Sequence, residues 1–383
     1  MQSPTPITTA KRSYEVIFLG TGTSSSLPHI DCLTAPPDQK PCRTCLSTLR
    51  PEGRHNIRRN TSVVLRISEE DGKSYTIVID VGKNFQAAAL EWFPKYGLRH
   101  IDGVLITHAH ADAMNGLDDL RGWTLMGAIQ SHIDVYVSEA TLGEVNRAFP
   151  YMVSKEFASG GGDVPSFVWH VVDDKTTFEI EDTGVMVTPF SVHHGRLFTT
   201  NTPPAFVPTP GHTGPNSPIR TPPIRNSLDF SENPTQTIHP CLCWGFKIDD
   251  AVVYLSDVSY IPDDTWAVLE SQTGTLPVFI LDCLHIEPHT SHYGLVQALT
   301  TARRIAARRT YLTGFSHSVG HDEYITLGEA IGGRVIADNA QLTANEREGL
   351  ALIAPGDNIW LRPAHDGLKI SISGSDVKDE SYD

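Results

Sequence analysis

The segment Thr107–Asp112, which reads THAHAD, constrains the fold and the chemistry of this chain more than any other feature. The apolar run Gly103–Thr107 leads into it and predicts a buried β-strand. Two histidines at positions i and i+2, directly after a strand, can turn the same way in an extended loop and close on one cation. A loop position accounts for most single histidines in a chain that has 17 of them, but this spacing at a strand end indicates a metal site.

Two later segments repeat the arrangement of a predicted strand that ends in a residue able to bind a metal. Val185–Val192 leads into His193 and His194, and Ala251–Ser256 leads into Asp257. Histidine nitrogens and carboxylate oxygens are common ligands of divalent metals. The later segments therefore strengthen the prediction of a metal site.

The composition limits the class of protein. The chain has 383 residues, of which 40% are hydrophobic, and this is enough for a large buried core. The net charge of −15 argues against a protein that coats nucleic acid. The N-terminal residues lack the apolar core of a signal peptide, and no apolar run approaches the roughly 20 residues that span a bilayer. We therefore expect a cytoplasmic or nuclear protein that is not secreted, with reduced cysteines.

The order of the apolar runs predicts an α/β fold. Many short runs rich in β-branched residues end in Gly, Asp or His, and helical patterns lie between some of them, most clearly at Tyr293–Arg309. Ten of the 26 prolines fall between Pro203 and Pro240, which predicts a long insertion at about 199–240. We expect one domain over residues 12–372, followed by a disordered acidic tail at 373–383.

The motifs, taken together, resemble those of the metallo-β-lactamase superfamily, most closely the branch that contains the phosphonate-pathway cyclic phosphodiesterase. The resemblance covers most of the chain and implies a four-layer αββα sandwich. The motifs that carry it are Leu19–Thr23, Ile79–Lys83, Thr107–Asp112, Gly116–Arg121, His194-Gly195, Ser256-Asp257, Ser291-His292 and Leu312–His317.

The resemblance also implies a set of catalytic metal ligands. His108, His110 and His194 match the first metal site of the superfamily. Asp257 matches the carboxylate that bridges two metals, and Asp112 matches an aspartate that binds the second metal and water. We therefore expect these five side chains to surround a divalent zinc or manganese ion.

The chain departs from the superfamily pattern at both histidines of the second metal. The usual HxHxDH motif ends here in Ala113, and the other histidine position holds Gly314. Carboxylates and water alone hold zinc less firmly than imidazoles do. We predict one firmly bound catalytic metal, with a second one weak or absent.

Three cysteines predict a separate zinc site. Cys32, Cys42 and Cys45 lie close together in the sequence, and the last two form a CxxC motif. A closed zinc site needs a fourth ligand, and the resemblance implies His317 for this role, with His321 as a weaker candidate. The alternative is a surface CxxC with a redox role or none.

A few further residues complete the predicted site. In the resembling branch, a histidine at the position of His292 faces the substrate and suits proton donation, although a structural role is equally compatible with the sequence. The resemblance gives Asp80 a role in supporting the histidine cluster. Arg58 and Arg59 could reach the cleft, but we expect a surface basic pair.

The residues and the resemblance together predict a hydrolase that activates water on a metal, with Asp112, Asp257 and His292 as catalytic residues. A phosphodiester, which could be cyclic, is the expected substrate class, and we expect a small anionic molecule rather than nucleic acid. A lactonase or thioesterase is the enzymatic alternative. A metal-binding protein without turnover is the other alternative, because Ala113 and Gly314 replace two ligands.

Overall fold

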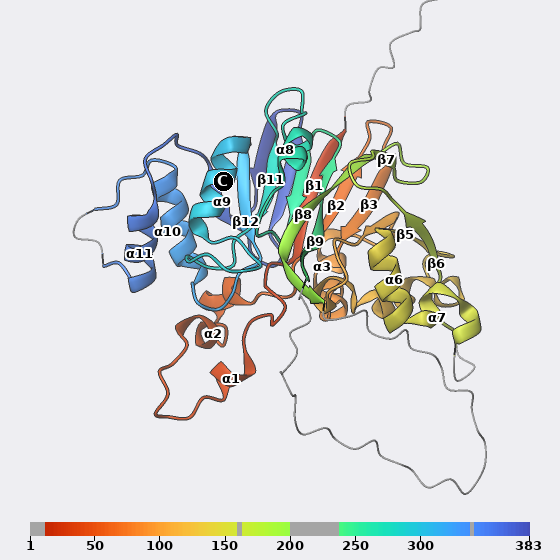
Figure 1. Ribbon diagram of the computed structural model, residues 1–383, viewed down its shortest axis with the longest axis horizontal. Coiled ribbons are helices and arrows are strands. Elements are labelled where there is room, and N and C mark those ends of the chain that lie inside the picture. Colours follow the sequence, from red (N-terminus) through yellow and green to blue (C-terminus); the bar gives the residue numbers. More distant parts are fainter. Residues whose placement is uncertain (1–11, 159–162, 200–236, 338–340) are drawn as a thin grey trace, which may run out of the picture.

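Two mixed β-sheets form the centre of the molecule (Figure 1). The computed structural model describes residues 12–158, 163–199, 237–337 and 341–383. In the first sheet the strand order is β15-β14-β1-β2-β3-β4-β5-β6. These strands are β1 (Ser13–Gly20), β2 (Ser62–Ser68), β3 (Ser74–Ile79), β4 (Gly103–Leu105), β5 (Ile133–Val137), β6 (Phe167–Val171), β14 (Lys369–Ser373) and β15 (Asp376–Asp379).

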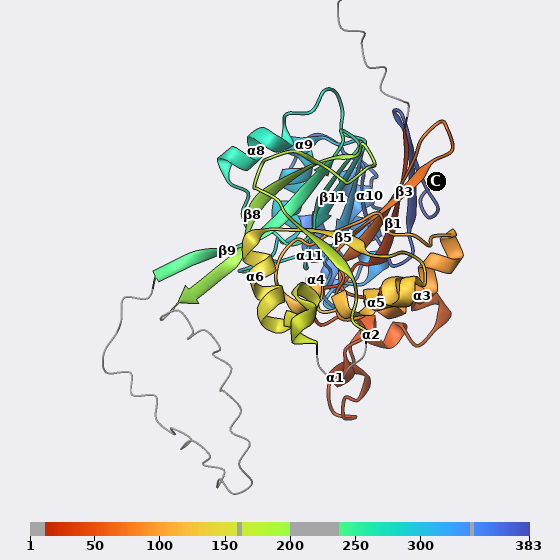
Figure 2. The same cartoon turned by 90° about the vertical axis from the view of Figure 1, so that its right-hand side faces the viewer.

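The second sheet has the order β13-β12-β11-β10-β9-β8-β7, and its strands β10 to β13 run parallel. The strands are β7 (Phe178–Glu179), β8 (Met186–Thr199), β9 (Thr237–Ile248), β10 (Val252–Leu255), β11 (Val278–Asp282), β12 (Arg309–Thr313) and β13 (Leu361–Pro363). Beyond the sheet, β8 and β9 project from the body of the molecule as a two-stranded ribbon (Figure 2).

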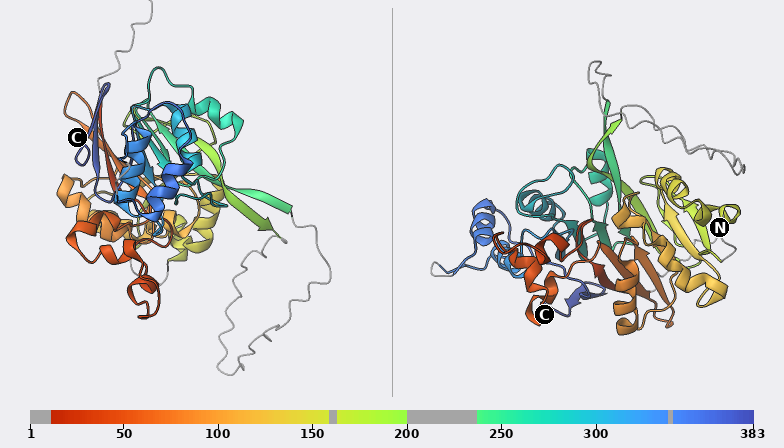
Figure 3. Two further views of the ribbon diagram at one scale, coloured as in Figure 1. Left: turned by 90° about the vertical axis from the view of Figure 1, so that its left-hand side faces the viewer. Right: turned by 90° about the horizontal axis from the view of Figure 1, so that it is seen from below.

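Helices cover the outer face of each sheet, with α9, α10 and α11 on one side of the strands and α3, α6 and α7 on the other (Figures 1 and 3). The α-helices are α1 (Ile30–Leu33), α2 (Arg43–Ser47), α3 (Phe85–Tyr96), α4 (Ala111–Met114), α5 (Arg121–Thr124), α6 (Glu139–Ala148), α7 (Pro150–Val153), α8 (Asp263–Leu269), α9 (Leu295–Ile305), α10 (His321–Ile331) and α11 (Ala344–Leu352). Short 3₁₀ turns lie at η1 (Pro51–Asn56), η2 (Leu117–Leu120), η3 (Leu125–Gly127) and η4 (Lys155–Phe157).

Three apolar cores separate these layers, and the alternation of side chains along the strands builds them. In β1, Val16 and Phe18 face the core between the two sheets, while Ile17 and Leu19 face the core under α3. In α9, residues spaced three or four apart, such as Ala298 and Ala302, are buried against the second sheet. The fold is thus the predicted four-layer αββα sandwich.

Two predictions from the sequence are wrong, one about the acidic end of the chain and one about the length of a helix. The acidic segment at 373–383, expected to be disordered, contains β15 and is well defined. Arg309 forms ion pairs with Asp379 at 2.7 Å and with Asp383 at 2.6 Å, and Tyr311 donates a hydrogen bond to Asp379. These acidic side chains have basic and phenolic partners, which composition alone does not reveal.

The expected helix at Tyr293–Arg309 is shorter, because Ala306 adopts a left-handed conformation that ends α9.

The expected insertion at about 199–240 lies for the most part outside the described residues, and its flanks belong to β8 and β9. No helix within the described ranges is long and apolar enough to cross a membrane.

Candidate metal centres and active site

Three imidazoles from two elements converge at the edge of the sheets. His108 and His110 follow β4, and His194 lies on β8. Their ring centroids lie 4.5 to 5.1 Å apart, and one nitrogen of each ring lies within 4.8 Å of the others. The two histidines of the HxH motif therefore turn the same way, as the sequence predicted, and a residue 84 positions away in the sequence completes the cluster.

The ring of His108 is oriented by a chain of hydrogen bonds that starts at Asp80. Asp80 follows β3 in a left-handed conformation (φ 62°), and its carboxylate accepts from the backbone N–H and the hydroxyl of Thr107. The Thr107 Oγ1 lies 2.8 Å from Nδ1 of His108. Asp80 therefore orients the ring of His108 through Thr107, which is the supporting role that the resemblance implies.

The free nitrogen of His108 fits a metal ion. Its Nε2 is buried and has no hydrogen-bond partner among the described residues. Burial lowers the pKa of His108 to about 3, so the ring is neutral and carries a lone pair at neutral pH. A buried lone pair without a donor is costly, and a cation would remove that cost.

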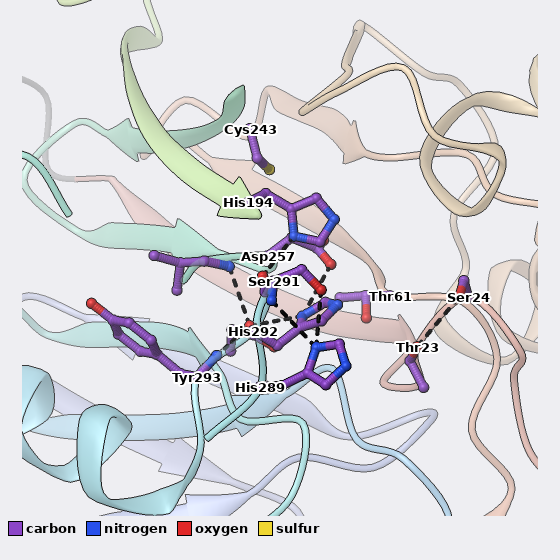
Figure 4. A network of polar contacts seen from close by, with 12 residues as sticks. Thr23, Ser24, Thr61, His194, Cys243, Asp257, His289, Ser291, His292 and Tyr293 are labelled. Carbon is purple, nitrogen blue, oxygen red and sulfur yellow. Dashed lines mark hydrogen bonds and ion pairs between the residues drawn. The ribbon is translucent and has the colours of Figure 1, made fainter. Parts of the chain in front are cut away.

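His194 is oriented in the same manner. Its Nδ1–H donates to the carbonyl oxygen of Ser291 at 2.8 Å, which leaves Nε2 as the ligand nitrogen. The next residue, Gly195, has φ 75°, and a Cβ there would lie 3.0 Å from the Cβ of Ser291. The bend after His194 thus requires a residue without a side chain. Figure 4 shows His194 pointing toward Asp257 and His292.

Asp257 is the carboxylate that joins this cluster. It follows β10 and is buried, and its oxygen lies within 4.8 Å of ligand nitrogens of His194 and His292. Burial would raise its pKa, but the imidazoles of His194 and His108 outweigh burial and hold the pKa below the ordinary value. Asp257 is therefore an anion that faces the imidazoles.

Asp112 lies near the cluster but is not among the converging ligand atoms of the described residues. It belongs to α4, directly after the HxH motif. Burial raises the pKa of Asp112, and repulsion by the negative charge of Asp257 raises it further. A cation between them would relieve that repulsion.

The two positions that lack a histidine are closely packed by other groups. The carbonyl of Ala113 accepts from the backbone N–H of Val81 at 2.8 Å, and only 2% of Ala113 is exposed. Gly314 has φ 77°, and a Cβ built on it would lie 2.4 Å from Oδ1 of Asp282. The space beside Gly314 thus holds a carboxylate where the superfamily pattern has an imidazole.

Asp282 is a site residue that the sequence reasoning did not identify. It ends β11 and is completely buried, and its Oδ2 accepts from Nδ1 of His292 at 2.9 Å and from the backbone N–H of Val258 at 3.2 Å. Burial alone would lower the pKa of His292, but the carboxylates of Asp282 and Asp257 raise it to about 9. Asp282 could have been identified from its position at the end of β11, because β11 lies between the strand that leads to Asp257 and the strand that leads to Gly314.

The cysteine cluster assembles around one nitrogen. Nδ1 of His317 lies 3.2 Å from the Sγ atom of Cys32 and 3.7 Å from the Sγ atoms of Cys42 and Cys45. All four ligand atoms lie within 4.8 Å of one another, as a tetrahedral zinc site requires. His29 stacks on His317 with the ring centroids 4.1 Å apart. The structure therefore gathers the four residues expected from the sequence.

His321, the weaker candidate for the fourth ligand, lies elsewhere. Its ring contacts His55 and the hydroxyl of Tyr382. Arg58 also differs from expectation, because only 1% of it is exposed and its guanidinium donates to backbone carbonyls of the loop that holds His317. Arg59 is closer to the surface and pairs with Glu91.

The arrangement defines a class of protein, an αββα sandwich with a cluster of His and Asp residues that could hold a metal at the edge of its sheets. Residues 75–212 match the family described as "Beta-lactamase superfamily domain". A solved structure described as a new diphosphatase from the PhnP family is similar to this chain, with a TM-score of 0.59 and 23% identity over 94% of this chain and 97% of that one. The chain therefore has the αββα fold of that structure, and its residues 75–212 are similar to the beta-lactamase superfamily domain.

Other proteins share the fold or part of the sequence. Zn²⁺-bound PqqB from Methylobacterium extorquens has a TM-score of 0.56 and 17% identity over 93% of this chain and 99% of that one. YhfI from Bacillus subtilis has a TM-score of 0.51 and 12% identity over 96% of this chain and 100% of that one. A protein called octanoyltransferase, from Porphyromonas gingivalis, is 32% identical over 183 residues, which are 47% of this chain. The match spans about a third of that relative, 31% of its length.

Proposed function

We propose that this chain is a metal-dependent hydrolase that cleaves a phosphodiester in a small anionic substrate at a one-metal site. The observation that carries the proposal is the convergence of His108, His110 and His194 beside the anionic Asp257. The buried, unpartnered Nε2 of His108 supports a metal at this point. The similarity in fold to a diphosphatase of the PhnP family favours phosphate chemistry over other hydrolyses.

A bound zinc or manganese ion would polarise the phosphoryl group and lower the pKa of water. The chain supplies the rest of the chemistry. Asp80 and the Ser291 carbonyl fix the two buried imidazoles, so that their remaining nitrogens face one point. Asp112, whose pKa is raised, is placed to accept a proton from the attacking water.

His292 is the group that donates a proton to the leaving oxygen. Asp282 holds Nδ1–H, so Nε2 is the nitrogen that remains for the substrate. The raised pKa of about 9 keeps the ring protonated at neutral pH, as a general acid requires. The imidazolium also adds positive charge where the superfamily places a second metal, and it can neutralise part of the phosphate charge.

We further propose that Cys32, Cys42, Cys45 and His317 hold a structural zinc. The site lies in the segment of α1 and α2, whose core is the small cluster around Leu27 and the cysteines. Such a segment gains most of its stability from the metal. Three convergent thiols without a disulfide fit a reducing compartment, and this supports a location in the cytoplasm or nucleus.

The test is hydrolysis by the metal-loaded protein of bis-p-nitrophenyl phosphate, a cyclic phosphodiester, a lactone and an octanoyl thioester. We expect turnover of the phosphodiesters, and its loss in His108→Ala. His193→Ala is the matched control, because His193 neighbours His194 on β8 and stacks on Tyr260 outside the cluster. Turnover of only the lactone or the thioester would replace the proposed substrate class, and a metal-loaded protein inactive on all four would favour metal binding without catalysis.

A further inference from the structure

A second group of three imidazoles lies apart from both metal centres. His55 ends η1, His321 begins α10, and His365 follows β13. The rings of His55 and His365 stack with centroids 4.0 Å apart and an interplanar angle of 10°. The ring of His321 lies 4.9 Å from His55 and 5.5 Å from His365. Because three segments distant in sequence supply these rings, the histidine cluster joins parts of the chain that no strand pairing connects.

The hydrogen bonds of the cluster can all be made by neutral rings. Nδ1–H of His365 donates to the carbonyl of Asp366 at 3.0 Å, so its Nε2 accepts from the hydroxyl of Ser381 at 2.7 Å. The hydroxyl of Tyr382 donates to the carbonyl of Pro363, and it therefore accepts from Nε2–H of His321. Nδ1 of His321 is buried and has no partner among the described residues. A second proton on this ring would have no acceptor.

The charged groups around the histidine cluster do not offset the cost of protonating one of its buried rings. Arg54 of η1 and the buried Arg58 lie on the same side as His55 and oppose protonation, while Asp322 of α10 and Asp379 of β15 favour it. Burial dominates at all three rings. It lowers the pKa of His365 to about 4, lowers that of His55, and holds that of His321 well below its ordinary value.

The cluster connects the C-terminal hairpin, defined here as Lys369–Asp383, to the zinc-binding segment. Ser381 and Tyr382 of the hairpin contact His365 and His321. The backbone N–H of His321 donates to Asn56 at 2.8 Å, and the side chain of Asn56 donates to Ser47 of α2. The histidine cluster thus links Ser381 and Tyr382 to α2, the helix that contains Cys45 of the CxxC motif.

We propose that His55, His321 and His365 form a pH-sensitive latch, which holds the end of the C-terminal hairpin, at Ser381 and Tyr382, against the start of α10 when the rings are neutral and releases this end when they are protonated, while β14 stays paired with β1. Protonation places like charges on rings that stack at 4.0 Å. It also gives His321 an N–H at Nδ1, which has no acceptor among the described residues. The latch requires no substrate and is independent of the proposed hydrolase activity.

The expected pH window follows from the closed and open states. A histidine with a pKa of about 4 when closed and 6.5 when open favours the closed state fully above pH 6.5, and this preference is lost as the pH falls from 6.5 toward 4. At pH 5.0, His365 alone shifts the balance toward the open state by about 30-fold. The other two rings act in the same direction.

Hydrogen–deuterium exchange of the full chain, kept in excess zinc at pH 7.5 and 5.0, tests the latch. After correction for intrinsic exchange, we expect protection of the peptide that covers Ser381 and Tyr382 to fall at least tenfold at pH 5.0, while the peptides of β14, β2 and β3 keep theirs. His55→Phe keeps a stacking ring that cannot be protonated, and His365→Gln keeps a donor and an acceptor. Each should reduce the pH effect, and the exposed His100→Gln is the control.

Unchanged protection of the wild-type hairpin at pH 5.0 would overturn the proposal without any variant. A full pH effect in both His55→Phe and His365→Gln would also overturn it. Zinc content measured at both pH values separates the latch from the release of metal by His317. If the hairpin opens only in samples that have lost zinc, the cysteine site and not the histidine cluster is the switch.

Discussion

Arg58→Met is the substitution that best tests how the zinc-binding loop is held. Arg58 is buried without a carboxylate partner in hydrogen-bond contact, and its guanidinium donates to the carbonyls of Ser316 and Val319. These two carbonyls lie on either side of His317 in the sequence. The guanidinium also lies 4.9 Å from the ring centroid of Phe315. Arg58 therefore holds the loop that supplies His317, the proposed fourth zinc ligand, on both sides of this residue.

The cost of the substitution follows from the groups that it leaves without partners. A hydrogen bond to a charged donor contributes about 1.5–3 kcal/mol, and a buried carbonyl without a donor costs about 1–3 kcal/mol. Methionine fills most of the volume and removes the desolvated charge, which offsets part of the loss. We expect a decrease of about 3 kcal/mol in the free energy of unfolding, with a measurable fall in zinc content because His317 is no longer fixed.

Urea unfolding and elemental analysis of zinc measure these two effects. Arg59→Met is the matched control, because Arg59 is adjacent in sequence but pairs with Glu91 near the surface. A partly exposed pair of this kind contributes about 1 kcal/mol or less, and its loss should leave zinc unchanged. If Arg58→Met unfolds within 1 kcal/mol of the wild type and retains its zinc, the buried guanidinium does not hold the loop.

Two further substitutions test the remaining parts of the site. Cys42→Ser should remove one equivalent of zinc and lower the melting temperature, with the second metal equivalent kept at the histidine site; unchanged zinc would remove the structural assignment. Asp282→Asn should lower kcat with little change in KM, because Asp282 orients His292 without touching the substrate. The acid form of His292 must be present for proton donation, so the lowered pKa of its ring should move the alkaline limb of the pH–rate profile to lower pH, and an unmoved limb would exclude His292 as the proton donor.

The grouping of the candidate metal ligands could be predicted because these residues occupy recognisable positions in the sequence. His108, His194 and Asp257 each follow a run of apolar residues, and the ends of such strands meet at one edge of the sandwich. Cys42 and Cys45 are separated by one turn, so their thiols must lie on the same side of α2. In these cases, local spacing determines where the side chain points.

Contacts that depend on tertiary packing could not be predicted, because no pattern in the sequence indicates them. Arg58 and Arg59 read as a basic pair, but adjacent side chains of an extended segment point to opposite sides, and only the assembled loops show that Arg58 points inward. The acidic end of the chain read as a solvated tail, because its partners Arg309 and Tyr311 lie some 70 residues earlier. Charge and composition describe a segment alone, whereas these contacts arise from other segments.

The candidate active site shows most clearly which contacts could not be predicted from the sequence. Ala113 and Gly314 show that two histidines of the second metal position are missing, but the sequence does not show which side chain fills the space beside Gly314. The structure places Asp282 there, with Oδ1 directed at the missing Cβ of Gly314 and Oδ2 bound to His292. A histidine at position 314 would need both a left-handed backbone and a displaced carboxylate. Gly314 therefore leaves room for the hydrogen-bonded pair of Asp282 and His292, and this pair favours the proposed one-metal hydrolase over metal binding without turnover.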